Sequence, residues 1–236
     1  MVHHLGLHAL AHADTPIGTI YLVRRPSPKG SGWVHDLKID GQLLMSSLNN
    51  LSERSLATRG LALHNGTGPR RVLVGGLGLG HTAQAALAQP RVTSVRVLEK
   101  MDFIIDWMEQ GLLPLSEPLT TDDRFEMVQG DVYDYLLGPA AQTYDVILVD
   151  VDHAPDNRLS EASLPFYSLE GQARVVRHLA PGGVLAVWSA TDNDDFAAVL
   201  GEIYSSAHRE GTGEDDVENP VDPICNVLFF GERGEG

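Results

Sequence analysis

The chain has 236 residues, which is enough for one large domain or for one domain with a small appendage. Its formal net charge is −15, with 32 Asp and Glu against 17 Lys and Arg. A uniformly acidic surface repels phosphate backbones and anionic lipids, so we expect no nucleic-acid partner and no membrane docking. Cys225 is the only cysteine, no apolar run reaches the ~20 residues of a membrane span, and we see no secretion signal, which together predict a cytoplasmic, soluble protein.

The chain divides at a run of turn formers from His64 to Pro69. Before the division, short β-like segments joined by turns predict a small antiparallel appendage followed by a connecting helix. We therefore expect an N-terminal part of residues 1–64 and a nucleoside-binding part of residues 65–236. The elements expected in the first part are β segments within His8–Val23 and Trp33–Met45, with turns at Asp14-Thr15-Pro16 and Asp40-Gly41, and a helix capped by Ser52 that ends at Leu63.

After Pro69 the pattern changes to alternating strands and helices, which predicts βαβ units and a parallel sheet. The acidic stretch from Gly213 to Asp222 is expected to be a loop, either a solvated connection or a lid. The predicted strands are Arg71–Val74, Ser94–Glu99, Phe125–Val128, Asp145–Asp150, Val184–Trp188 and Asn226–Phe230, and the predicted helices are His81–Gln89, Met101–Gln110, Tyr133–Leu137, Phe166–Leu179 and Asp195–Tyr204.

A glycine-rich loop, Gly75 to Gly80, joins the first of these strands to the helix that begins near His81. Glycines permit positive φ and let a ligand approach the backbone closely, and the free N–H groups of the helix point at whatever lies there. A tight turn without a ligand is the alternative. The loop fits G-x-G-x-G better than the dinucleotide pattern G-x-G-x-x-G, which suits a nucleoside without a pyrophosphate. The candidate contacts are Gly76, Gly78 and Gly80.

Two acids follow the next two strands. Glu99 closes the second strand, 19 residues after Gly80, where a carboxylate can accept hydrogen bonds from ribose hydroxyls. Its alternative is an exposed strand-end acid. Asp131, with Val132 beside it, follows the third strand, where an aspartate can accept a hydrogen bond from an adenine amino group. Capping of the next helix is the alternative for Asp131.

Asp150, Asp152 and His153 lie at the end of the fourth strand. In an open parallel sheet ligands bind outside the carboxyl ends of the strands. Two acids and a histidine at that edge could orient a nucleophile or remove its proton, which makes these residues the catalytic candidates. A polar loop that begins a helix is the alternative.

At this point the chain resembles the spermidine synthase (polyamine aminopropyltransferase) family, most strongly over Val72 to Ala190. The family's loop GGGDGG corresponds to Gly75 to Gly80, and its ribose acid falls on Glu99. Its adenine-side aspartate falls on Asp131, and the first aspartate of its DSSDP motif falls on Asp150.

The departures from the family pattern concern the acids that would hold a polyamine. The loop aspartate of the family is Gly78 here, and the second aspartate of DSSDP is His153, although Asp152 lies next to it. We find no counterpart of the family's YHE motif in Leu51 to Leu56. The chain therefore looks like a divergent branch.

The resemblance implies a Rossmann-like class I methyltransferase fold with an antiparallel final strand, and a homodimer. It also implies a sulfonium nucleoside cofactor, either S-adenosylmethionine or its decarboxylated form, and a small-molecule acceptor. We expect no metal, because no acid or cysteine completes a site with the N-terminal histidines. Methyl transfer is the leading reaction, aminopropyl transfer to an amine is the alternative, and a catalytically silent nucleoside-binding protein is the third hypothesis.

Overall fold

The structure is a computed structural model that describes residues 6–28, 30, 32–151, 154–156, 161–212 and 226–235. Two of the three catalytic candidates, Asp152 and His153, lie outside these ranges, as do Cys225 and the acidic stretch from Gly213 to Asp222. No helix in the described part of the chain is both long and apolar enough to cross a bilayer.

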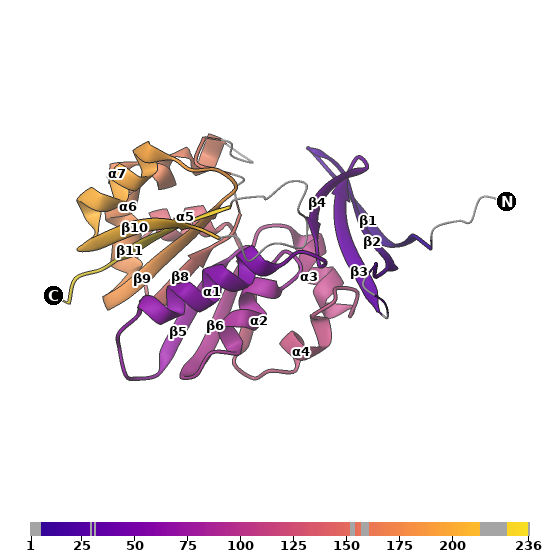
Figure 1. The fold of residues 1–236 in the computed structure, drawn as a ribbon, viewed down its shortest axis with the longest axis horizontal. Coiled ribbons are helices and arrows are strands. Elements are labelled where there is room, and N and C mark those ends of the chain that lie inside the picture. The colour runs from indigo at the N-terminus through magenta and orange to yellow at the C-terminus, as the bar shows by residue number, and fades with distance from the viewer. Residues whose placement is uncertain are drawn as a thin grey trace.

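A small antiparallel sheet forms the N-terminal part, as the turn signals predict (Figure 1). One face of this sheet presents apolar side chains to the core of the larger sheet, including Ile20, Leu22 and Leu37. The other face of this sheet leaves large side chains exposed to solvent, among them Tyr21. The strands pair in chain order and are β1 (His8–Thr15), β2 (Gly18–Pro26), β3 (Trp33–Ile39) and β4 (Gln42–Ser46).

The larger sheet has seven strands in the order β10-β11-β9-β8-β5-β6-β7. The five strands from β9 to β7 are parallel, and β11 runs antiparallel to β9. The predicted α/β class, with a parallel sheet and an antiparallel final strand, is confirmed. The strands are β5 (Arg70–Gly75), β6 (Val92–Glu99), β7 (Phe125–Gln129), β8 (Tyr144–Val149), β9 (Leu179–Ser189), β10 (Ser206–Gly211) and β11 (Val227–Glu232).

Helices cover both faces of this sheet, because its central strands are apolar on both sides. In β5, Val72 and Val74 enter one hydrophobic cluster while Leu73 enters the other. The first cluster lies under α1, α2, α3 and the N-terminal sheet, and the second lies under α5, α6 and α7 (Figure 1). The helices are α1 (Leu51–Leu63), α2 (His81–Leu87), α3 (Asp102–Glu109), α4 (Ser116–Thr120), α5 (Val132–Leu137), α6 (Leu169–Val175) and α7 (Asp194–Ile203).

Two details of the helices differ from the prediction. Ser52 does not cap α1: the cap position is Asn50, and the Ser52 hydroxyl donates to the Glu53 carboxylate. The single helix expected from Phe166 to Leu179 is three shorter pieces, because Ser168 caps a new helix after Pro165. These pieces are a 3-10 helix (Glu161–Tyr167), α6, and a second 3-10 helix (Val176–His178).

Candidate functional site

The candidate site lies at the carboxyl ends of β6, β5 and β8. β5 pairs with β6 on one side and with β8 on the other, so the residues that follow these three strands meet at one edge. These residues are Glu99, the loop from Gly75 to Gly80, and Asp150. The sheet therefore brings together three of the features predicted from the sequence.

The glycines of the loop allow close contacts that any side chain would block. Gly76 has φ +88°, and a Cβ there would lie 2.5 Å from the backbone oxygen of Asp150. Gly78 has φ +52°, and a Cβ there would lie 2.9 Å from Cε of Met45, which reaches over the loop from β4. The loop is thus fitted to its neighbours on both sides, and Met45 occupies the space next to the position where the spermidine synthase motif has aspartate.

Glu99 is buried and joined to the loop. Its Oε2 accepts a hydrogen bond from the Leu77 N–H at 2.8 Å, and its Oε1 accepts one from the Met101 N–H at 2.8 Å. Only 8% of the residue is exposed, so the alternative of an exposed strand-end acid is wrong. Burial raises the pKa of Glu99, and these backbone N–H groups oppose that rise. The N–H groups of Gly78 and Lys100 also lower the pKa of Glu99, so the carboxylate is held by the backbone on both sides of the strand end.

Asp131 caps α5, which is the alternative that the sequence left open. Its Oδ1 accepts a hydrogen bond from the Tyr133 N–H at 2.8 Å, and its Oδ2 lies 2.9 Å from Lys100 Nζ. The side chain of Val132 is buried against Gly75, where a Cβ would lie 2.6 Å from one of its methyl groups. A contact of Asp131 and Val132 with the adenine of a bound nucleoside stays a prediction.

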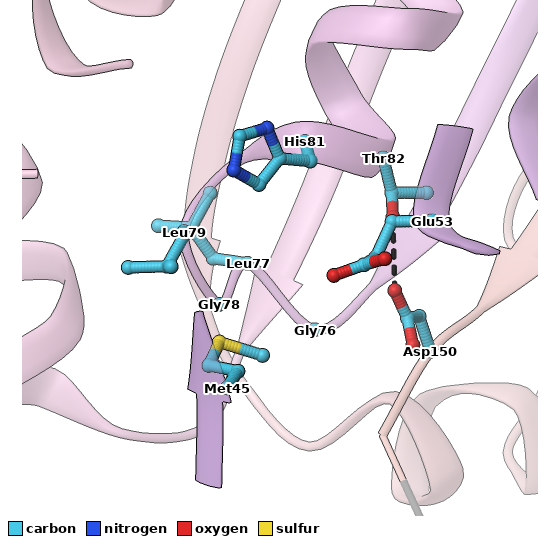
Figure 2. A pocket seen from close by; sticks show the side chains of 9 residues that line it. All are labelled: Met45, Glu53, Gly76, Leu77, Gly78, Leu79, His81, Thr82 and Asp150. Carbon is cyan, nitrogen blue, oxygen red and sulfur yellow. Dashed lines mark hydrogen bonds between the residues drawn. The ribbon is translucent and has the colours of Figure 1, made fainter. Parts of the chain in front are cut away.

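Asp150 directly follows β8 and faces the start of α2. Its Oδ2 accepts a hydrogen bond from Oγ1 of Thr82 at 2.9 Å (Figure 2). Burial and, after it, the charge of Glu53 raise the pKa of Asp150 to about 7. A carboxyl group with that pKa can gain or lose a proton near neutral pH, as a general base must.

A small pocket lies between Asp150 and the glycine loop, and sequence reasoning missed several of its residues. Figure 2 shows the acids Glu53 and Asp150 on one side, Met45 and Leu79 on the other, and His81 at the head of the pocket. The full lining consists of Met45, Glu53, Gly76, Leu77, Gly78, Leu79, His81, Thr82 and Asp150.

Glu53 is the most important of the missed residues. Leu51 to Leu56 contain no counterpart of the YHE motif, but Glu53 projects from the first turn of α1 into the pocket. Its place just after the N-terminal strands was the available signal. The segment thus supplies an acid to the pocket although it lacks the family motif.

His81 is the second missed residue, and its position directly after the loop was the signal. Its Nε2 is buried and has no hydrogen-bond partner among the described residues. Burial and the positive charge of Arg54 lower the pKa of His81 to about 4, so the imidazole is neutral near pH 7. A buried polar nitrogen without a partner is costly, which directs attention to a ligand as the missing partner.

No three His, Cys, Asp or Glu residues gather as metal ligands within the described ranges. The described part of the site consists of the glycine loop, the carboxyl groups of Glu53, Glu99 and Asp150, and the neutral imidazole of His81.

Comparison with known proteins places this geometry in context. No family model matches the chain. Putrescine N-methyltransferase 2 from Nicotiana tabacum is 29% identical over 184 residues, which cover 66% of this chain and 50% of that protein. Putrescine N-methyltransferase 2 from Nicotiana attenuata is also 29% identical, with 66% and 47% covered. The chain thus spans about half the length of the curated relatives that it matches.

Two solved structures have the same architecture over nearly the whole chain. A spermidine synthase in complex with the transition-state analogue AdoDATO superimposes with a TM-score of 0.74 at 17% identity, covering 97% of this chain and 74% of that one. A spermidine synthase from Thermotoga maritima gives a TM-score of 0.71 at 17% identity, with 97% and 73% covered. The chain has the spermidine synthase fold. The resemblance predicted from the motifs is confirmed at the level of the fold.

Proposed function

We propose that the protein is an enzyme that transfers the methyl group of S-adenosylmethionine to a small amine. The observation that carries this proposal is the pairing of the glycine loop with Asp150, a partly buried carboxyl group whose pKa of about 7 suits proton removal. The similarity to putrescine N-methyltransferases supports both the donor and an amine acceptor.

In this proposal the protein positions two reactants and removes a proton. Glu99 holds the ribose of the donor, and the donor lies against the backbone of the glycine loop. The nitrogen lone pair of the neutral amine attacks the methyl carbon, the carbon–sulfur bond breaks, and its electron pair stays on sulfur. Ionised Asp150 accepts the proton that the amine must lose. Two pairs of residues remain candidates for further contacts. Asp131 and Val132 would contact the adenine of the donor, and Asp152 and His153 would contact the acceptor.

The choice of donor rests on Gly78. An aspartate there would attract the ammonium of decarboxylated S-adenosylmethionine and repel the carboxylate of S-adenosylmethionine. Glycine removes that repulsion. We therefore propose that S-adenosylmethionine binds at least as tightly as its decarboxylated form.

The test is turnover with each donor against a panel of small amines that includes putrescine. S-adenosylhomocysteine is the product expected from methyl transfer, whereas methylthioadenosine would report aminopropyl transfer. A preference of about tenfold or more for the decarboxylated donor, measured by titration, would reject methyl transfer. Binding of the donor without turnover of any acceptor would instead support a catalytically silent protein.

Aminopropyl transfer is the second candidate, and a specific observation favours it. Glu53 and Asp150 form an acidic side of the pocket that could hold a primary ammonium, and the fold is that of spermidine synthase. Asp152 would then be the replacement for the missing amine-binding acid of the loop.

We further propose a cytoplasmic homodimer that needs no metal. A single cysteine, which excludes an intrachain disulfide, supports the compartment. β4 is an edge strand on which Leu43 and Leu44 are 59% and 46% exposed, and Trp33 on β3 is 48% exposed, which supports pairing of two N-terminal sheets. Light scattering that finds a 25.6 kDa monomer at micromolar concentration would reject the dimer.

A further inference from the structure

The pocket is electrically asymmetric over a short distance. At its acidic side, burial and then the negative charge of Glu53 raise the pKa of Asp150. At its head, burial and then the positive charge of Arg54 lower the pKa of His81. Glu53 and Arg54 are neighbours near the start of α1, but only Glu53 lines the pocket, whereas Arg54 is exposed to solvent.

The donor's tail reaches this pocket if its ribose lies at Glu99. Glu99 ends β6, whereas the pocket lies over the ends of β5 and β8, one and two strands away. Adjacent strands are about 4.8 Å apart, so the distance is that of a short aliphatic chain. The amino-acid tail of S-adenosylmethionine beyond sulfur is two methylene groups and an α-carbon that carries an ammonium and a carboxylate.

We propose that His81 is a specificity-determining residue that donates a hydrogen bond from Nε2 to the carboxylate of S-adenosylmethionine. This inference rests on the proposed function and names the group that selects its donor. Glu53 then faces the donor's ammonium, and Asp150 remains available to the acceptor. The hydrogen bond supplies the partner that Nε2 lacks among the described residues.

A neutral imidazole suits this role. It offers one N–H donor to an anion and carries no charge that would attract the two acids across the pocket. Met45 and Leu79 form the apolar wall that the methylene groups of the tail would contact. Arg54 is solvent-exposed, so its attraction for the carboxylate is screened by salt and adds little at physiological ionic strength.

The test compares three nucleosides by calorimetric titration of the full chain: S-adenosylmethionine, its decarboxylated form, and methylthioadenosine, which lacks the whole tail. His81→Phe keeps a flat ring but removes the donor. We expect it to weaken S-adenosylmethionine binding by about 10- to 100-fold, which is the range for a hydrogen bond to a charged group. Binding of the other two nucleosides should change less than about twofold, because neither has the carboxylate.

His81→Gln is the conservative variant, because its amide retains an N–H donor. It should keep most of the affinity for S-adenosylmethionine, and if His81→Phe does not fold, His81→Gln against His81→Ala decides in the same way. Equal losses for S-adenosylmethionine and methylthioadenosine, or no loss for either, would overturn the role of His81 while leaving the proposed function intact. If the unaltered protein binds none of the three nucleosides, the proposed function fails first and the inference fails with it.

Discussion

Asp150→Asn should make the protein more stable and less active at the same time. The substitution preserves the shape of the side chain, and its amide oxygen can still accept the hydrogen bond from Thr82. It removes a charge that the folded protein holds at a cost, since burial and Glu53 raise the pKa of Asp150 from 3.8 to about 7. A structural role alone would instead predict a loss of stability.

The sign and size of the effect on stability follow from the two pKa values. Between pH 3.8 and about pH 7 the folded protein binds more protons at Asp150 than the unfolded chain does, so its stability falls as the pH rises through that window. At about 1.36 kcal/mol per pKa unit the full cost is roughly 4 kcal/mol. Residual water and relaxation around the carboxylate reduce it, and we expect roughly 1–3 kcal/mol above neutral pH.

Urea unfolding near neutral and at mildly acidic pH measures this cost directly. The stability gained by Asp150→Asn should be largest above about pH 7 and shrink as the pH falls toward about 4. Asp106→Asn is the matched control, because Asp106 is exposed in the middle of α3 and its replacement removes the same charge. A variant at Asp150 that is less stable than the unaltered protein at about pH 8 would refute the reasoning.

The same variant separates binding from chemistry. Affinity for S-adenosylmethionine should survive, whereas turnover should fall by about 10²–10⁴, the range for loss of a general base. In the unaltered enzyme the rate should rise as the pH increases through about 7, because the ionised form of Asp150 accepts the proton. Full activity in Asp150→Asn would move the catalytic role to Asp152 or His153.

Three further substitutions probe the rest of the site. Glu99→Ala should cost roughly 1.5–3 kcal/mol of donor binding in calorimetric titration, and unchanged affinity would remove Glu99 from the ribose site. Gly78→Asp should reverse the donor preference only when it is combined with Met45→Ala, because the Met45 thioether lies against Gly78. The φ of +52° at Gly78 is already costly for a side chain. The single variant Gly78→Asp should therefore have a lower melting temperature than the double variant. Glu53→Gln should lower the pKa of Asp150 and so shift the acidic limb of the pH–rate profile to lower pH, and an unmoved profile would contradict the coupling.

Much of the fold could be predicted because the larger sheet depends on local patterns. The runs around Leu73 and Ile147 are apolar on both faces, and turn formers separate them from amphipathic helices. The sequence did not predict β10, because the residues from Ser206 to Gly211 do not place apolar side chains on one face. The segment forms a strand because it pairs with the edge of β11. Pairing partners of that kind are set by tertiary structure, not by the segment itself.

The site could be predicted only where its residues follow strands. The glycine loop and Glu99 follow β5 and β6, and the order of strands in a parallel sheet brings such residues to one edge. Met45 and Glu53 reach the site from a different part of the chain, more than twenty residues before the loop. No spacing rule connects Met45 to the loop, and the place of Glu53 after the N-terminal strands is a weak signal until α1 and β4 are packed beside the loop.

That packing brings two residues of the N-terminal part, Met45 and Glu53, into the pocket, wherever a domain boundary is drawn. Gly60 lets α1 lie close to the sheet, since a Cβ there would be 3.0 Å from Leu148 and 3.2 Å from Ala186. The same helix then holds Glu53 beside Asp150, while β4 holds Met45 over Gly78. One contact sets the charge next to the proposed base, and the other covers the loop position at which donors are distinguished. Under the proposed function, the N-terminal part therefore shapes both the reactivity and the selectivity of a site whose glycine loop lies beyond it.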